Sequence, residues 1–319
     1  MSRTSSTSTR TEPAGSAALG TGLVLFAAVM WGTWSLWFRP TELSGRTTAP
    51  FVFACITLSS IPLMVRERAT RASPIRWTPR VLAMLAAFTV FDALNAATFF
   101  HAMTVTTVAV AVLTHDLAPV LVALLAPRVD GVKVPGASLA AILALGGVTL
   151  LLEPWREGAL GGDVLLGASL GLVSAVAYAG NVFLGRKLTL ELGTATTLGV
   201  HALGAWLLLL PLAGTELFAI EARDVPYLAF AGLVPGALAG LAFLRGSALV
   251  GSARAAILAF VEPVVACVVG FFAFGERLSL WSLAGGALVL AAGLLVSRPR
   301  PQGEGAPPPR QAVSDSQGP

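Results

Sequence analysis

Five ionisable side chains lie inside long apolar stretches of this sequence, where a charge is costly. The acids are Asp92, Asp116 and Glu262, and the histidines are His115 and His201. Ionisable groups are rare in membrane-embedded segments and mark substrate or ion pathways when they occur, so each is a functional candidate. No Lys or Arg lies at mid-depth in these stretches, so no obvious buried cation pairs with the acids.

Asp116 is the strongest of these candidates, because it lies near the middle of its apolar run and three residues before Pro119. A proline removes one helical hydrogen bond and frees a carbonyl group. An acid beside such a helix break could couple transport to protons or cations, or it could be a hydrogen-bonded structural acid. His115 adjoins it, but consecutive helical residues project about 100° apart, so one could line a cavity while the other packs between helices.

Asp92 and Asn95 are three residues apart and share one helical face with Phe99. This face predicts either a polar cavity wall or an interhelical hydrogen-bond pair. If the helices that carry Asp92 and Asp116 are adjacent and antiparallel, the two carboxyl groups lie at similar depth and could share a proton.

Glu262 directly precedes Pro263. This pair is either a site acid next to a helix break or a purely structural device. Tyr178, Asn181 and His201 are weaker candidates for substrate contact, because each is a single polar group in an apolar run.

Three tryptophans recur every three residues, at Trp31, Trp34 and Trp37. They form either an interface belt or an aromatic cavity wall suited to apolar or cationic substrates. Trp31 and Trp34 are deep enough in their run for the second role, whereas Trp37 is near the outer interface.

The composition indicates what positions these residues. The chain of 319 residues is 55% hydrophobic and 12% charged, with a mean hydropathy of +0.78. Soluble domains carry about 25% charged residues. In lipid only helices and closed barrels satisfy the backbone, and the long, non-alternating runs favour helices. Cys55 and Cys267 lie in such runs and are expected to be buried apolar residues, not a disulfide or metal site.

Ten apolar runs predict ten membrane spans, at 17–38, 50–65, 81–100, 104–126, 136–152, 164–185, 195–213, 226–244, 254–274 and 280–297. The division between the third and fourth runs, at His101–Thr104, is barely polar. Residues 1–16 and 298–319 are expected to be disordered tails. With both termini in the cytoplasm, 16 of the 21 basic residues fall in cytoplasmic segments, as the positive-inside rule requires. We therefore expect a multi-pass protein of the inner (plasma) membrane.

An offset of 144 residues aligns 105–126 with 249–270, which places Pro119 on Pro263 and Trp34 on Tyr178. The repeats would be 17–155 and 160–297, with five spans each. Because five is odd, the second repeat enters the membrane in the opposite orientation, an arrangement common among alternating-access transporters.

The second half resembles an EamA-type member of the drug/metabolite transporter superfamily in four segments: Gly246–Ile257, Glu262–Val264, Phe274–Ser279 and Gly285–Ala287. In the first half Trp31–Thr33 and Val108–Pro119 are similar to the first and fourth spans of that family. The Gly-Glu-Arg turn has no counterpart after the fourth span, where Asp130–Lys133 stands. The resemblance implies ten helices in two inverted five-helix repeats and the export or exchange of amino acids, metabolites or drugs. Glu276, in this turn, is expected to cap a helix.

The sequence thus predicts a secondary active transporter that exports small metabolites, amino acids or drug-like solutes by alternating access, with proton coupling as an option. A lipid flippase would share the fold and stays an alternative. An integral-membrane enzyme acting on a lipid-like substrate is a further alternative, although the expected cluster of acids or histidines is missing. A nucleotide-binding Gly-rich motif is also missing. The expected partners are a small-molecule substrate, membrane lipid and protons, without a metal, cofactor or nucleic acid, and the oligomeric state is left open.

Overall fold

The computed structural model describes residues 14–129, 136–152, 155, 161–259 and 261–296. Within these ranges the regular structure is helical, as the composition predicts. The predicted tails at 1–16 and 298–319 lie outside the described residues, except for 14–16. Those three residues belong to the first helix.

The helices of the first half are α1 (Ala14–Trp31), α2 (Trp34–Phe38), the 3-10 helix η1 (Arg39–Thr41), α3 (Gly45–Thr70), α4 (Pro79–Val105), α5 (Val108–His115), α6 (Ala118–Val129) and α7 (Ala137–Leu152). Those of the second half are α8 (Gly162–Leu192), α9 (Thr194–Ala213), the 3-10 helix η2 (Gly214–Ala219), α10 (Val225–Ala231), the π-helix η3 (Gly232–Leu238), α11 (Ala239–Val250), α12 (Ser252–Ala259), α13 (Val261–Phe274) and α14 (Leu280–Val296). Each predicted apolar run overlaps one of these helices or a consecutive group of them.

The lengths and compositions of these helices suit a membrane. Among the described residues, six helical stretches are long and apolar enough to cross a bilayer. A seventh consists of two pieces, Ser16–Trp31 and Trp34–Thr41, that meet at an angle of 42°. Three shorter apolar helices span 138–150, 261–274 and 280–292. The chain is therefore an all-α, multi-pass membrane protein.

The break between the third and fourth runs is not where the sequence analysis placed it. The expected break at His101–Thr104 is wrong, because α4 continues through Val105. The interruption comes at Thr106 and Thr107, which both have extended backbone dihedrals. The hydroxyl oxygen of Thr107 accepts a hydrogen bond from the backbone N–H of Val110 at 3.2 Å, so this threonine is the N-cap of α5.

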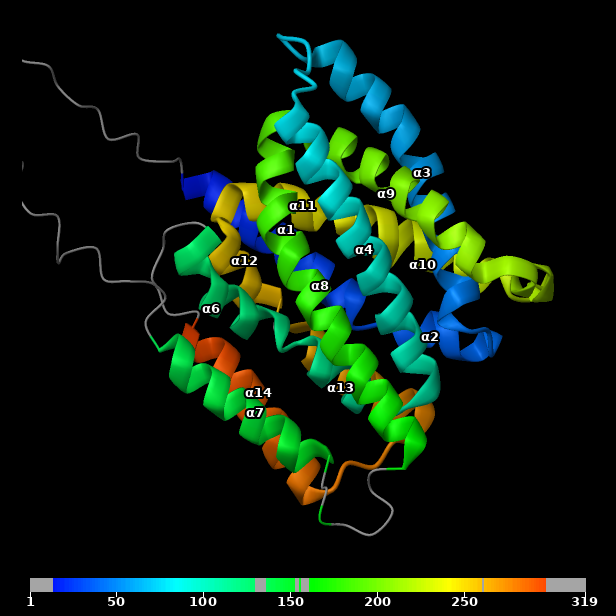
Figure 1. Cartoon of the computed structure of the whole chain (residues 1–319), viewed down its shortest axis with the longest axis vertical. Helices are drawn as coiled ribbons and strands as arrows, with labels where there is room; N and C mark the ends of the chain where they lie inside the picture. Colours follow the sequence, from blue (N-terminus) through cyan, green and yellow to red (C-terminus); the bar gives the residue numbers. More distant parts are fainter. Residues whose placement is uncertain (1–13, 130–135, 153–154, 156–160, 260, 297–319) are drawn as a thin grey trace, which may run out of the picture.

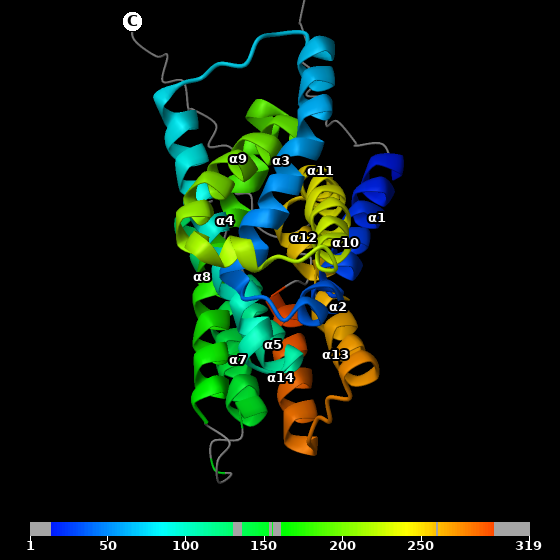
Figure 2. The same ribbon diagram turned by 90° about the vertical axis from the view of Figure 1, so that its right-hand side faces the viewer.

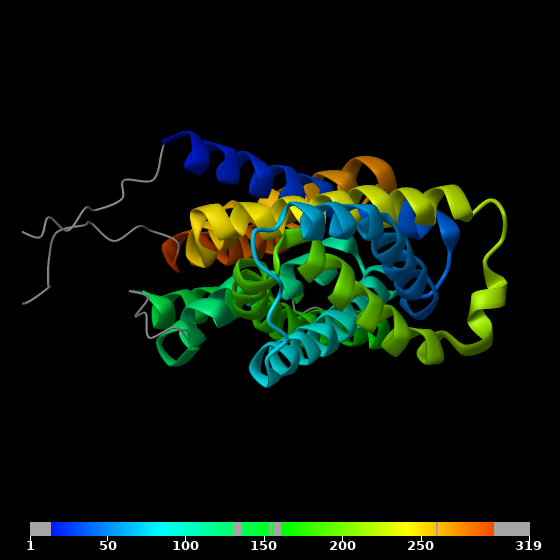
Figure 3. The same ribbon diagram turned by 90° about the horizontal axis from the view of Figure 1, so that it is seen from above.

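The helices pack in pairs between the two halves. In Figures 1 and 2, α4 runs alongside α8, and α7 runs alongside α14. The view from above in Figure 3 shows α1 and α11 together on one side of the molecule. The remaining large contact joins α3 and α9. Each of these pairs combines one helix of the first half with one of the second.

Helices α3 and α9 are held together at both ends by carboxylates. Glu67, near the end of α3, accepts hydrogen bonds from the backbone N–H groups of Thr196 at 2.8 Å and Ala195 at 3.2 Å, at the start of α9. In return Glu216, just after α9, accepts from the hydroxyls of Ser44 at 2.7 Å and Thr47 at 3.2 Å, at the start of α3. A negative charge is favourable near a helix N-terminus, so both ends of this antiparallel pair are stabilised alike.

Arg39 joins the ends of four helices. Its guanidinium forms an ion pair with Glu276 at 2.7 Å and donates to the carbonyls of Met103 at 3.1 Å and Thr106 at 2.7 Å. Glu276 also accepts from the backbone N–H of Val108 at 2.9 Å. Glu276 is thus a helix cap, as expected, but the helix it caps is α5, which lies far away in the sequence. We call this contact between α2, α4, α5 and the end of α13 the Arg39–Glu276 bridge.

The contact between α3 and α4 depends on a glycine. A Cβ atom at Gly45 would fall on the backbone nitrogen of His101 and lie 2.7 Å from its Cα. Backbone atoms cannot rotate away as a side chain can, so Gly45→Ala must push the two helices apart. We expect a loss of roughly 1–3 kcal/mol of stability, measured as a lower melting temperature of the detergent-solubilised protein. Gly22→Ala is the control, because nothing lies within 4 Å of its added Cβ; equal melting of the two variants would contradict the tight contact.

Candidate functional site

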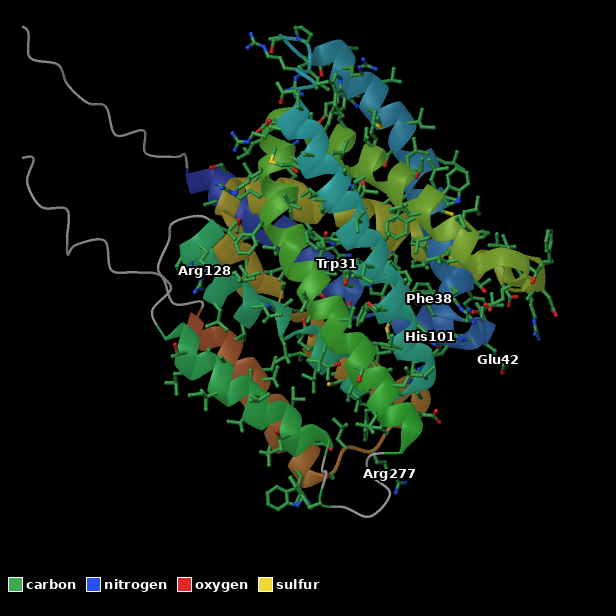
Figure 4. The ribbon with its side chains drawn as sticks, viewed as in Figure 1. Trp31, Phe38, Glu42, His101, Arg128 and Arg277 are labelled. Atoms are coloured by element: carbon green, nitrogen blue, oxygen red, sulfur yellow. The ribbon has the colours of Figure 1, made fainter. Side chains whose placement is uncertain are left out.

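A central cavity lies among the helices of both halves. Its empty space, including the part open to solvent, is about 870 Å³. Residues from α1, α2, α3, α4, α5, α8, α9, η3, α11 and α13 line it. In Figure 4 one of these, Trp31, lies in the middle of the bundle. The site is therefore an interior chamber, to which most of the spanning helices contribute.

Interrupted helices border this cavity. Trp31 ends α1 and Trp34 begins α2, so the two rings flank the interruption at Gly32 and Thr33. The indole N–H of Trp31 donates to the carbonyl of Pro235, in the π-helical segment η3, at 2.9 Å. A Cβ atom at Gly32 would lie 2.7 Å from the carbonyl oxygen of Glu262, so the break in α1 also packs tightly against the start of α13. Such π-helical and broken segments are frequent at functional sites.

Asp92 is fully engaged by two neighbours across the cavity wall. Its Oδ1 accepts from the side-chain N–H of Asn181 at 2.9 Å, and its Oδ2 lies 2.8 Å from Nε2 of His201. Nδ1 of His201 lies 2.7 Å from the carbonyl oxygen of Thr197, which can only accept, so Nδ1 carries a hydrogen. The contact between Nε2 of His201 and Oδ2 of Asp92 is a hydrogen bond only if one of these two atoms also carries a hydrogen. The pair of Asp92 and His201 therefore has no net charge while this bridging proton is present.

His115 belongs to a second polar chain. The hydroxyl of Ser174 donates to Oδ1 of Asn95 at 2.7 Å. Because a hydroxyl has one hydrogen, Nδ1–H of His115 must donate to Ser174, over 2.8 Å. The imidazole is stacked on the ring of Phe99, with centroids 4.3 Å apart, and lies 5.0 Å from that of Tyr178. This chain fixes the tautomer and the orientation of His115 at the cavity wall.

Two acids are buried without such partners. Glu262 lines the cavity with only 3% of its surface exposed. Among the described contacts, Glu262 has no ion pair and no hydrogen bond, and the one charge that acts on it is that of Asp116. Asp116 is equally buried, and no described group bonds its Oδ2. Asp116 and Glu262 therefore lie close enough to interact electrostatically.

The cavity brings together six of the seven residues predicted to bind substrate or to couple transport: Asp92, Asn95, His115, Glu262, Trp34 and Tyr178. Asp116 is not in its lining and lies behind the wall next to His115. Trp31, His201 and Asn181 also line the cavity, whereas Trp37 does not. The rings of Phe88 and Phe243 complete it; nothing in the sequence distinguishes them from other apolar residues.

One of the two predicted helix-breaking prolines is in the first turn of a helix. Pro119 is the second residue of α6, and Asp116 and Leu117 separate that helix from α5. A proline is tolerated in the first helical turn because the backbone N–H it lacks would have no partner there. Pro119 therefore marks where a second helical piece starts. The predicted break at Pro263 falls next to residue 260, between α12 and α13, which lies outside the described residues.

Three comparisons identify the type of protein. A sequence profile of the EamA-like transporter family matches residues 165–298. A protein from Archaeoglobus fulgidus, described as an uncharacterized transporter, is 31% identical over 293 residues, which cover 88% of this chain and 96% of the relative. One crystal structure superposes with a TM-score of 0.63 at 17% identity, over 90% of this chain and 99% of the other, and thus shares the fold. The chain belongs to the EamA-like transporter family, and it is a membrane transporter of the drug/metabolite transporter superfamily.

Proposed function

We propose that this protein is a secondary transporter that exports small metabolites, amino acids or drug-like solutes by alternating access through the central cavity. The observation that carries the proposal is the cavity itself, which is bounded by helices of both halves and by interrupted segments. Discontinuous helices at the interface between two repeats are where secondary transporters bind their substrates.

The helix pairs support a ten-span inverted repeat, with halves at 17–155 and 160–297. When the ten proposed spans are numbered in chain order, α1 belongs to span 1, α4 to span 3, α8 to span 6 and α11 to span 8. The two-fold axis of an inverted repeat then exchanges the pair α1–α11 with the pair α8–α4. The same axis maps the pairs α3–α9 and α7–α14 onto themselves. The carboxylates of Glu67 and Glu216 follow this symmetry, because each binds the start of the other's helix. The boundary residues 153–154 and 156–160 lie outside the described part of the chain.

A substrate screen in proteoliposomes tests the transport function. We expect at least one small solute to show counterflow, that is, uptake of labelled solute driven by unlabelled solute inside. Inside-out vesicles from an overexpressing strain should then accumulate this solute, because an exporter moves it away from the cytoplasmic face. Movement of lipid headgroups without any soluble substrate would favour a flippase instead.

The proposed location is the inner membrane, with both termini in the cytoplasm. Two basic residues expected on opposite sides of the membrane are well separated in the structure: Figure 4 shows Arg128 at one side of the molecule and Arg277 away from it. This separation supports the expected placement of these two residues on opposite sides of the membrane.

A cysteine-labelling experiment tests this orientation. In a background with Cys55→Ala and Cys267→Ala, Ser73→Cys in the exposed segment between α3 and α4 should resist an impermeant maleimide in intact cells and react after permeabilisation. Glu221→Cys is the control at the opposite end, where the native side chain is 64% exposed, and it should react in intact cells. Labelling of position 73 from outside would reverse the orientation.

Proton coupling is part of the proposal. It is supported by the interacting acids Asp116 and Glu262, both enclosed by protein, and by the bridging proton that the contact between Asp92 and His201 requires. A carboxyl group that is alternately protonated and deprotonated at such a place is a common proton carrier in transporters.

A further inference from the structure

We infer that the central cavity is selective for amphipathic organic cations, in which a protonated or quaternary amine is attached to an aromatic or branched apolar body. This inference names the substrate class and rests on the proposed transporter function. It follows from the acidic residues and the aromatic rings that line the cavity, and from the kinds of solute that this lining disfavours.

The acidic groups of the wall leave one carboxyl group without a partner. The described lining contains two acids, Asp92 and Glu262, and neither Lys nor Arg. Asp92 is compensated by His201 and Asn181. Glu262 is not compensated, and a buried carboxylate without a partner is costly. A ligand that brings a positive charge would supply the missing partner.

Aromatic rings line the same cavity as Glu262. The ring of Trp31 is 4.8 Å from that of Phe243 and stands edge-on to that of Tyr178 at 6.3 Å. The hydrogen bond to Pro235 fixes the indole in this position. Ring faces attract ammonium groups, and the attraction grows when water is excluded.

Tyr178 adds a polar group to the same cavity. Within the described structure its hydroxyl has no hydrogen-bond partner although it is buried. Buried hydroxyls usually have a partner, so a ligand that carries an N–H group would complete this bond as well. The carboxylate, the free hydroxyl and the aromatic faces together suit an amine better than any neutral solute.

The same wall disfavours organic anions and free amino acids. Both carry a carboxylate that needs a cationic partner, and the described lining offers no Lys or Arg for it. The two histidines are already oriented by other groups, His115 by Ser174 and His201 by Thr197 and Asp92. A neutral solute would gain no ion pair with Glu262.

Three probes with the same phenethyl body test the inference by calorimetric titration of the detergent-solubilised protein. Phenethylamine carries a positive charge, N-acetylphenethylamine is neutral and phenylalanine is zwitterionic. We expect phenethylamine to bind about tenfold or more tightly than either of the others, because only it pairs with Glu262 without burying a second charge. Equal binding of the amine and its acetyl derivative, or tighter binding of phenylalanine, would overturn the inference.

Variants locate the effect. Glu262→Gln keeps the size of the side chain and removes its charge, and should weaken phenethylamine binding about tenfold while leaving N-acetylphenethylamine unchanged. Glu191→Gln is the matched control, since Glu191 is exposed at the end of α8, away from the cavity lining. If Glu262→Gln fails to fold, the comparison of the three probes on the unmodified protein still tests whether the cavity prefers cations.

Counterflow in proteoliposomes separates this inference from the transporter proposal. If other solutes are transported while amines neither bind nor compete with them, the cation inference is wrong and the transporter stands. If amines bind as predicted and no solute of a broad panel shows counterflow, the cation site stands and the transporter proposal fails.

Discussion

Replacing Arg39 with methionine is expected to destabilise the protein more than the loss of any exposed ion pair would. The pair of Arg39 and Glu276 is largely enclosed, with side chains 22% and 11% exposed. Without Arg39, the carboxylate of Glu276 loses its counter-charge, and the carbonyls of Met103 and Thr106 each lose a donor. Breaking a buried pair from one side typically costs about 3–5 kcal/mol, and the partial exposure here lowers our expectation to roughly 2 kcal/mol. A thermal melt in detergent measures it.

Two comparisons make this result specific. Glu276→Gln should cost less than Arg39→Met, because its amide oxygen can still accept from the N–H of Val108. Arg223→Met removes a pair with Glu221 in which both side chains are mostly exposed, at 72% and 64%, together with a longer contact of 3.9 Å to Asp224, and should lower the melting temperature much less than Arg39→Met. If Arg39→Met melted at the same temperature as Arg223→Met, the Arg39–Glu276 bridge would contribute nothing to the stability of the protein.

Asp116→Asn is expected to abolish transport driven by a pH gradient while preserving counterflow. Asparagine has nearly the same shape but cannot release a proton, so a coupling step that uses this carboxyl group stops. Because Asp116 is not in the cavity lining, substrate binding itself should be retained. The measurement is solute accumulation in proteoliposomes across a series of imposed pH gradients, with counterflow at equal pH on both sides as the reference.

The control for Asp116→Asn is Asp163→Asn. It changes an exposed aspartate in the first turn of α8 and should transport like the unmodified protein. Accumulation by Asp116→Asn that follows the pH gradient as before would exclude this residue from coupling. In that case the bridging proton between Asp92 and His201 would be the next site to test.

Features within one helix could be predicted from the sequence. Asp92, Asn95 and Phe99 were expected on one face of α4 because their spacing follows the helical period, and all three line the cavity. The sequence also indicated that Asp116 and His115 need not share a face. It could not say which one faces the cavity, because the rotation of α5 is set by its packing against α8, including the hydrogen bond to Ser174.

Features that depend on contacts between distant segments could not be predicted. The sequence indicated that Glu276 caps a helix, but its partner, the N–H of Val108, is 168 residues away. The apolar run predicted as the sixth span ends at residue 185, because the basic residues Arg186 and Lys187 follow it, whereas the helix α8 continues to Leu192. The true start of α5 had a local signal that we did not use, since Thr107 is a good N-cap residue.

The carboxylates at the two ends of the α3–α9 pair have a mechanical consequence. A helix that is tied to its neighbour at one end can still shift lengthwise, but Glu67 and Glu216 tie this pair at both ends, so sliding would break one set of bonds. Rotation about the shared axis keeps both sets. We therefore expect the two halves to rock about α3 and α9, so that the same movement opens one end of the chamber and narrows the other, and a solute meets one side of the membrane at a time.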